Sequence, residues 1–122
     1  MSGRVLVVED ENDSMELVLG VLEHHGVDSV GASDAEKTLL MLKDMRPTLI
    51  VIDLALPGMD GWGLLKNIRT NKQLSRVPCA AITAFHTPEL PDQAIAAGFN
   101  AYFAKPLDAI SFVRQLEGIV EA

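Results

Sequence analysis

Acidic, hydroxyl and ammonium side chains follow short apolar runs at four places along the chain. Three carboxylates held close together repel one another at neutral pH, and a divalent cation relieves that repulsion. Oxygen-only ligands favour Mg²⁺, with Mn²⁺ as a substitute, and such sites often bind a phosphate group as well. These residue types therefore indicate a metal-dependent phosphoryl site if the fold brings them together. The candidate residues are Glu9, Asp10, Asp53, Thr83 and Lys105.

Asp53 is the carboxylate for which we predict a chemical role. A carboxylate can act as a nucleophile toward a phosphoryl group and form an acyl phosphate. The cation and the ammonium group of Lys105 would neutralise charge on the transferring oxygens, as phosphoryl transfer requires. Thr83 could donate a hydrogen bond to the bound phosphoryl group. The set predicts phosphoryl transfer to Asp53.

These residues become neighbours only if the apolar runs form adjacent strands. Five such runs alternate with five stretches of helical spacing, which favours a parallel sheet covered by helices. We therefore predict a three-layer, doubly wound α/β domain. Functional side chains in this fold collect beyond the carboxyl ends of the central strands, where the strand order reverses. The predicted strands are Val5–Val8, Val27–Val30, Leu49–Ile52, Pro78–Ile82 and Ala101–Phe103.

The helices are predicted from apolar spacing and from signals at their ends. Asp13 and Glu16 form a capping box that is expected to start the first helix, and Gly26 is expected to end it. Pro47 is expected to stop the second helix. A short fourth helix is predicted near Asp92–Ala97. The predicted apolar positions are Ala35, Leu39, Leu42 and Met45 in the second helix, Leu64, Leu65 and Ile68 in the third, and Ile110, Val113, Leu116 and Val120 in the last.

The composition indicates one globular domain. The chain has 122 residues, of which 48% are hydrophobic, and its formal net charge is −7. This charge disfavours direct nucleic-acid binding, which needs a basic surface. Cys79 is the only cysteine, so a reducing compartment is expected. The apolar runs are too short for a signal sequence or a membrane span, so we expect a soluble cytoplasmic protein without membrane contact.

The motifs taken together closely resemble the receiver domain of two-component response regulators. They are VVED (7–10), VIDLALPGMDG (51–61), ITA (82–84) and YFAKP (102–106), each at the end of a predicted strand. The similarity runs from Arg4 to the last helix. It implies a flavodoxin-like (βα)5 sheet with strand order 2-1-3-4-5. It also implies a single receiver domain over residues 1–122, for which we expect no output domain.

The resemblance implies a function for each acidic residue. Asp53 would be the phosphoacceptor, receiving its phosphoryl group from a histidine kinase or a histidine phosphotransfer protein. Asp10 and Asp53 would bind Mg²⁺ directly, together with the backbone carbonyl of Ala55. Glu9 would act mainly through a water molecule on the metal.

The resemblance also implies a conformational switch. Thr83 and Lys105 would contact the phosphoryl group, and the ring of Tyr102 would turn inward as Thr83 moves. The face made by the fourth helix, fifth strand and fifth helix would then bind a downstream protein. A weak homodimer is left open. The bond between Lys105 and Pro106 is typically cis in this family.

The sequence departs from the family pattern in several places. Glu9 stands where many receivers have Asp. Pro88 and Pro91 leave the start of the fourth helix open. Ala55 and Phe85 are expected to flank the phosphoryl group, and neither side chain can orient an attacking water molecule. We therefore expect slow self-dephosphorylation.

Other functions fit the sequence less well. A haloacid-dehalogenase-like phosphatase has a second acid two residues after its nucleophile, where this chain has Ala55, so an enzyme with its own substrate is not expected. A flavin carrier needs a loop rich in Gly, Ser or Thr after the first strand, whereas here that loop is acidic. The complete acid, Thr and Lys set disfavours a pseudo-receiver that only binds partners. A receiver module from a larger regulator or hybrid kinase remains an alternative.

Overall fold

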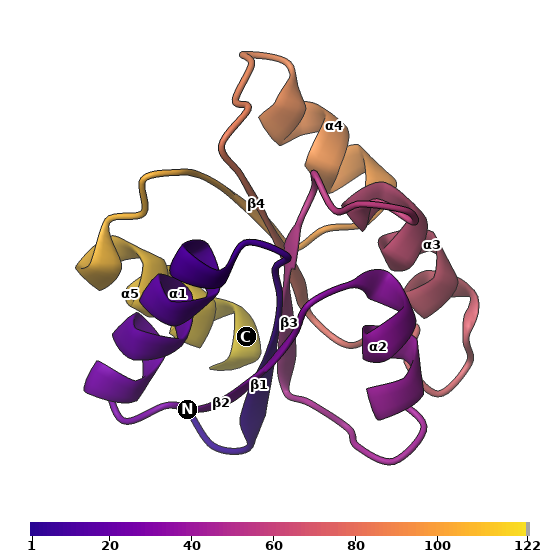
Figure 1. Ribbon diagram of the computed structural model, residues 1–122, viewed down its shortest axis with the longest axis horizontal. Coiled ribbons are helices and arrows are strands. Elements are labelled where there is room, and N and C mark those ends of the chain that lie inside the picture. The colour runs from indigo at the N-terminus through magenta and orange to yellow at the C-terminus, as the bar shows by residue number, and fades with distance from the viewer. Residues whose placement is uncertain (122) are drawn as a thin grey trace.

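A five-stranded parallel sheet with helices on both faces is seen in the computed structural model, which describes residues 1–121 (Figure 1). The strands are β1 (Arg4–Val8), β2 (Asp28–Ala32), β3 (Leu49–Asp53), β4 (Cys79–Thr83) and β5 (Ala101–Ala104). The helices are α1 (Asn12–His24), α2 (Ala35–Met41), α3 (Gly61–Thr70), α4 (Leu90–Ala97) and α5 (Ala109–Glu121). The strand order is β2-β1-β3-β4-β5, which confirms the predicted doubly wound fold.

Two apolar clusters lie on opposite faces of the sheet. Figure 1 shows α1 and α5 on one face and α2, α3 and α4 on the other. Alternate residues of a strand point to opposite faces. Val5 and Val7 of β1 therefore pack on the side of α1 and α5, whereas Leu6 and Val8 pack on the side of α3. Strands β1 and β3 are buried on both sides. A shift of one residue in their pairing would therefore turn each side chain to the opposite face of the sheet, where a different apolar cluster is packed.

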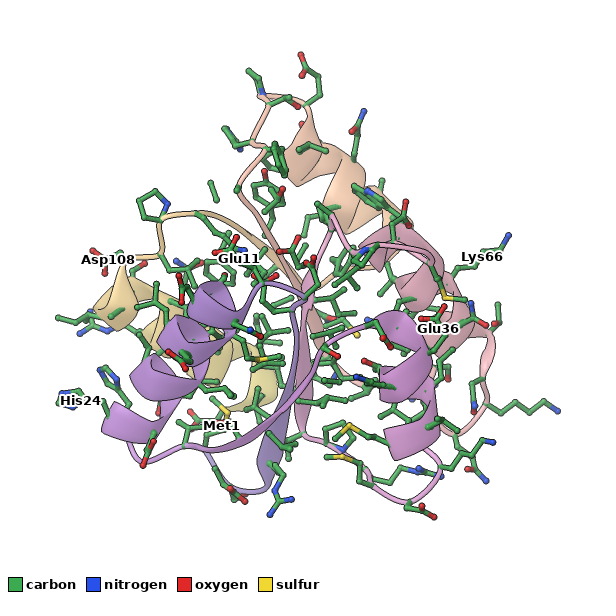
Figure 2. The ribbon with its side chains drawn as sticks, in the orientation of Figure 1. Met1, Glu11, His24, Glu36, Lys66 and Asp108 are labelled. Atoms are coloured by element: carbon green, nitrogen blue, oxygen red, sulfur yellow. The ribbon has the colours of Figure 1, made fainter. Side chains whose placement is uncertain are left out.

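Charged helical side chains lie on the outside of these layers. Figure 2 shows His24 at the end of α1 and Lys66 on α3 pointing away from the core, and both are exposed. Among the described helices of residues 1–121, none is both long and apolar enough to cross a membrane.

The start of α3 is packed directly on the end of β3. Asp60 caps this helix, because its side chain accepts a hydrogen bond of 2.9 Å from the amide of Gly63. Gly61 is buried, and a Cβ atom there would lie 2.5 Å from the carbonyl oxygen of Asp53 and 2.8 Å from the Cα of Leu54. Glycine at position 61 therefore allows the close approach that holds the loop after Asp53 in place.

The observed strand ends agree with the predicted ones or differ by at most two residues, and Asp53 is itself the last residue of β3. The predicted capping box of α1 is wrong. The helix begins at Asn12 with Glu11 as its N-cap, and no side chain caps it, so Asp13 already lies inside the first turn. Gly26 follows the helix with φ of 74°, as predicted for a C-terminal glycine.

The prediction that Pro47 stops the second helix is also wrong. Helix α2 ends at Met41, and the chain continues in tight turns over residues 42–44. The guanidinium of Arg46 donates hydrogen bonds to the carbonyl oxygens of Leu42 and Met45. These bonds satisfy carbonyl groups that a longer helix would have used, so α2 can end before the proline.

The last two helices each differ from the prediction in one feature. Helix α4 begins at Leu90 rather than near Asp92, because Pro91 fits the first turn, where no amide hydrogen is needed. In α5 the buried side chains include Phe112 and Val113, but Ile110 is 64% exposed. The buried face is centred between Phe112 and Leu116, so Ile110 lies on its flank and not in the predicted apolar face.

Candidate functional site

The carboxyl ends of four strands bring the candidate residues to one edge of the sheet. Glu9 and Asp10 follow β1, Asp53 ends β3, Thr83 ends β4, and Lys105 follows β5. The strand order reverses between β1 and β3, which is where doubly wound proteins bind their ligands. Each of these polar side chains comes at or directly after the end of an apolar strand, and Glu9, Asp53 and Thr83 are themselves buried.

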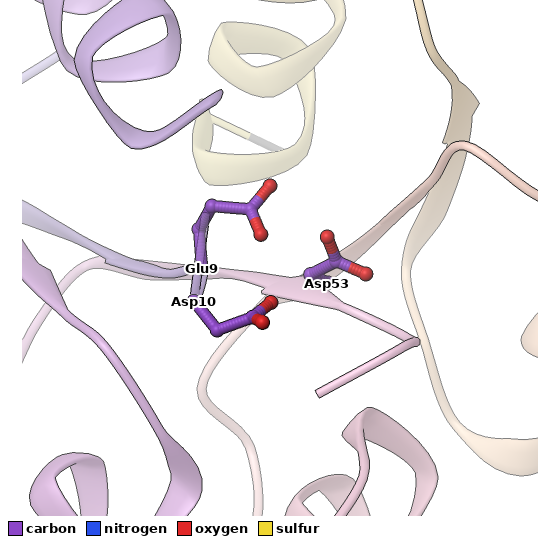
Figure 3. Close-up of side chains that lie close together, drawn as sticks. All are labelled: Glu9, Asp10 and Asp53. Atoms are coloured by element: carbon purple, nitrogen blue, oxygen red, sulfur yellow. The ribbon is translucent and has the colours of Figure 1, made fainter. Parts of the chain in front are cut away.

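Three carboxylates form a compact group at this edge. One oxygen atom from each of Glu9, Asp10 and Asp53 lies within 4.8 Å of the others. Figure 3 shows the three side chains lying close together. Glu9 and Asp53 are buried, whereas Asp10 is exposed. An oxygen-only set with one open side suits a hard divalent cation that also binds a phosphate group. The residues therefore fit Mg²⁺.

Lys105 joins two of these carboxylates. Its ammonium group donates a hydrogen bond of 2.9 Å to Oδ2 of Asp53 and another to Oε1 of Glu9. Burial works against the charged form of Lys105, but the two carboxylates outweigh it and raise its pKa. Burial and the neighbouring Glu9 raise the pKa of Asp53, while Lys105 and the amide of Ala55 oppose this. The ammonium group thus offsets the electrostatic repulsion between the carboxylates of Asp53 and Glu9.

The loop after β3 orients the second oxygen of Asp53. The amide of Ala55 donates a hydrogen bond of 2.7 Å to Oδ1 of Asp53. The amide of Leu54 donates to the carbonyl of Ile82 on β4. Ala55 itself is exposed, and only its amide is bonded to Asp53.

Thr83 and Tyr102 have hydrogen-bond partners outside the acidic group. Thr83 is buried, and its hydroxyl oxygen accepts a hydrogen bond of 3.0 Å from the amide of Phe85. Within residues 1–121, no hydrogen bond joins Thr83 to Asp53. The hydroxyl of the half-buried Tyr102 is hydrogen-bonded to Nδ1 of His86 at 2.8 Å. The bond between Lys105 and Pro106 is cis, as the resemblance implies.

Sequence reasoning missed two contacts of the site. The hydroxyl of Ser14 in α1 donates a hydrogen bond of 2.5 Å to Oε1 of Glu9, and His86 pairs with Tyr102 as described. Ser14 follows Glu9 by five residues, a spacing that joins a strand end to the first turn of the next helix. That spacing is the signal that could have indicated the first contact.

The sequence matches the response regulator receiver domain family over residues 5–117. Among curated proteins, chemotaxis protein CheY-3 of Vibrio cholerae is 34% identical, and the match covers 97% of this chain and 92% of that protein. The phosphate regulon transcriptional regulatory protein PhoB of Escherichia coli K12 is 30% identical over 98% of this chain. That match covers 52% of PhoB, so the chain spans about half of its length.

Solved structures show the same relationship. The receiver domain of Francisella response regulator 1452 superposes with a TM-score of 0.89, at 25% identity, and 98% of each chain is covered. The receiver domain of sensor histidine kinase PA1611 from Pseudomonas aeruginosa PAO1, solved with a magnesium ion coordinated in its active site cleft, has a TM-score of 0.89 at 25% identity. All of both chains is covered in that match. We conclude that the chain belongs to the response regulator receiver domains, the signalling switches of two-component systems.

Proposed function

We propose that Asp53 accepts a phosphoryl group from a histidine kinase or a histidine phosphotransfer protein in a Mg²⁺-dependent reaction. The observation that carries this proposal is the group of three carboxylates within 4.8 Å, two of them contacted by the ammonium of Lys105. Asp10, Asp53 and the carbonyl of Ala55 would hold the metal directly, with Glu9 beside them. The magnesium ion in the PA1611 receiver supports this choice of cation.

The transfer would be a direct displacement at phosphorus. A carboxylate oxygen of Asp53 forms a new bond to phosphorus, and the bond from phosphorus to the donor imidazole nitrogen breaks. The electron pair of that bond stays on the imidazole. Lys105, already 2.9 Å from Asp53, would pair with the negative oxygens of the transferring group. When bound, the metal would neutralise further charge on those oxygens.

The modified aspartate would then act on its surroundings. A phosphoryl group adds a charge of about −1.5 to −2. We propose that Thr83 exchanges its hydrogen bond with Phe85 for one with the phosphoryl group, and that Tyr102 leaves His86 and turns inward. The surface of α4, β5 and α5 would change its affinity for a downstream protein, with a coupling free energy on the order of 1–3 kcal/mol. Residues 1–121 would act together as one receiver domain.

Acetyl phosphate and mass spectrometry test this function. The wild-type protein should gain the mass of one phosphoryl group with MgCl₂ present and none with excess EDTA. Asp53→Asn should gain nothing, and the exposed Asp13→Asn serves as a matched control that should behave as wild type. The modification should be stable in acid and labile in base, as an acyl phosphate is. Amide resonances of α4, β5 and α5 should shift in the modified sample.

Two results would contradict the proposal. A phosphoryl gain that persists in Asp53→Asn would place the acceptor elsewhere. Modification of wild type without any change in the amide resonances of α4, β5 and α5 would contradict the proposed conformational switch but not the role of Asp53 as phosphoacceptor.

A further inference from the structure

The buried carboxylate of Glu9 is held by hydrogen bonds from two other side chains. Its side chain is 1% exposed, and its oxygens have three donors nearby. The hydroxyl of Ser14 donates to Oε1 at 2.5 Å, Lys105 donates to the same atom, and the amide of Glu11 lies 3.4 Å from Oε2. The contact at 3.4 Å is weak, so two side chains supply most of the binding.

Only one of these two side chains bonds Glu9 and none of the other carboxylates of the site. Lys105 is shared, because its ammonium group also contacts Asp53. When a phosphoryl group is attached to Asp53, its oxygens would compete for that same ammonium group. Ser14 has no such competitor, since it comes from the first turn of α1 and reaches only Glu9 among the three carboxylates. A buried carboxylate that loses its donors is strongly disfavoured, so the second anchor matters most when Lys105 turns away.

The type of acid makes the anchor necessary. Glutamate has one more methylene group and one more rotatable bond than aspartate. Without a fixed donor its carboxylate can take several orientations, and only some of them lie beside Asp10 and Asp53. The longer side chain also explains why a residue in the helix can reach it. A shorter acid at position 9 would leave Ser14 without this partner.

We propose that Ser14 is a positioning residue of the acidic site. Its hydroxyl holds the carboxylate of Glu9 in the orientation that serves the cation while Lys105 contacts Asp53 or its phosphoryl group. The proposal rests on the proposed function, because it concerns the same metal-dependent site. Ser14 acts through Glu9 and does not itself bind the cation.

A magnesium titration of the full chain tests this role. Amide resonances of Asp10 and Asp53 are followed as MgCl₂ is added at constant ionic strength. Ser14→Ala should weaken Mg²⁺ binding by about 10-fold, the low end of the effects of removing a residue that orients a metal-site side chain, because Glu9 would act through a water molecule on the metal. Ser14→Thr, which keeps the hydroxyl, should bind nearly as wild type. Ser111→Ala is the matched control, because Ser111 is the third residue of α5 as Ser14 is of α1.

A double-mutant cycle separates positioning from a general effect on the helix. In Glu9→Asp the carboxylate no longer reaches Ser14, so adding Ser14→Ala should change Mg²⁺ affinity little further. A structural effect on α1 would instead appear equally in both backgrounds. If Ser14→Ala does not fold, Ser14→Thr and Ser14→Val provide the same comparison with side chains of equal shape.

The outcomes are distinct. Wild-type affinity in Ser14→Ala, or an equal loss in the wild-type and Glu9→Asp backgrounds, would overturn the role of Ser14 while acetyl phosphate still modifies the wild-type chain. Absence of Mg²⁺ binding by the wild type would overturn both this role and the proposed function. Loss confined to the background that keeps Glu9, with rescue by Ser14→Thr, would establish the role.

Discussion

At the scale of single residues, the three carboxylates of the site differ in their neighbours. Glu9 is buried and bound by Ser14 and Lys105, and Asp53 is buried and bound by Lys105 and the amide of Ala55. Asp10 is exposed, and within residues 1–121 it makes no ion pair. Hydrogen bonds within the protein thus orient the two buried acids, whereas the exposed carboxylate of Asp10 is accessible to a cation.

Position 55 should control the lifetime of the phosphorylated state. The amide of Ala55 donates a hydrogen bond of 2.7 Å to Asp53, and we expect its side chain to flank the phosphoryl group. A methyl group cannot orient a water molecule, but an amide or a carboxylate can. We predict that Ala55→Asn and Ala55→Glu dephosphorylate several-fold faster than wild type. Intact-mass measurements over time, after removal of the phosphodonor, provide the rate.

The control for this change is Ala96→Asn on α4, where the residue is also exposed but belongs to another element. It should leave the lifetime unchanged. Equal lifetimes for wild type and both Ala55 variants would show that water is oriented by some other group.

At the scale of elements, the junction of β3 and α3 determines where the reactive carboxylate is held. The amide of Gly61 donates to the carbonyl of Leu54, and the missing side chain lets α3 start against the backbone of Asp53. Glycine normally weakens a helix, and the sequence alone indicates only that effect at residue 61. Here it permits a contact that no residue with a Cβ atom can make without displacing the backbone.

Two glycines in helices should respond in opposite directions to alanine. Gly61→Ala introduces a backbone clash and should destabilise the protein by about 1–3 kcal/mol. Gly20→Ala in α1 has open space within 4 Å and should stabilise it by about 0.5–1 kcal/mol through helix propensity. Urea denaturation followed by circular dichroism measures both free energies of unfolding. Unchanged or increased stability of Gly61→Ala would contradict the packing described for Gly61.

At the scale of the whole molecule, the concentration of negative charge at one edge of the sheet destabilises the folded state. The net charge is −7, and three carboxylates meet at one edge of the sheet. Lys105 is the only Lys, Arg or His residue among residues 1–121 that forms an ion pair with this group. One ammonium group cannot neutralise three carboxylates, so the folded state without a cation retains repulsion. A divalent cation should therefore stabilise the entire fold.

Magnesium binding should appear in the unfolding equilibrium. A ligand that binds only the folded state adds about 2.7 kcal/mol at 100 times its Kd. In Asp10→Asn one of the three like charges is gone, so the metal-free protein should be at least as stable as wild type. Because a proposed direct ligand is also gone, MgCl₂ should stabilise this variant much less. Urea denaturation in MgCl₂, compared with NaCl at equal ionic strength, measures the difference.

Asp13→Asn changes an exposed carboxylate of α1 outside the group and should keep the full magnesium effect. If Asp10→Asn gained as much stability from MgCl₂ as the control, Asp10 would not be a ligand.

Much of this molecule follows from patterns that are local along the chain. Apolar runs of strand length, alternating with helical spacing, are sufficient to predict a parallel sheet, and the first polar residue after each run identifies its functional edge. Asp53 illustrates this, since the five residues of β3 are all buried and the last of them carries the charge. Local pattern is informative here because a strand covered by helices on both faces needs a continuous apolar run, and a helix between two strands makes them parallel.

The remaining features depend on side-chain contacts that the apolar pattern does not encode, even where the partners are only four or five residues apart. The side chain of Arg46 bonds the carbonyl of Leu42 after α2, Ile110 is exposed because of how α5 lies on the sheet, and Ser14 bonds Glu9. The sequence alone is enough to place acidic residues at one edge of a sheet and to assign the family. The packed structure was needed to show which donor each carboxylate receives, because hydrogen-bond partners are chosen by distance in space and not by order along the chain.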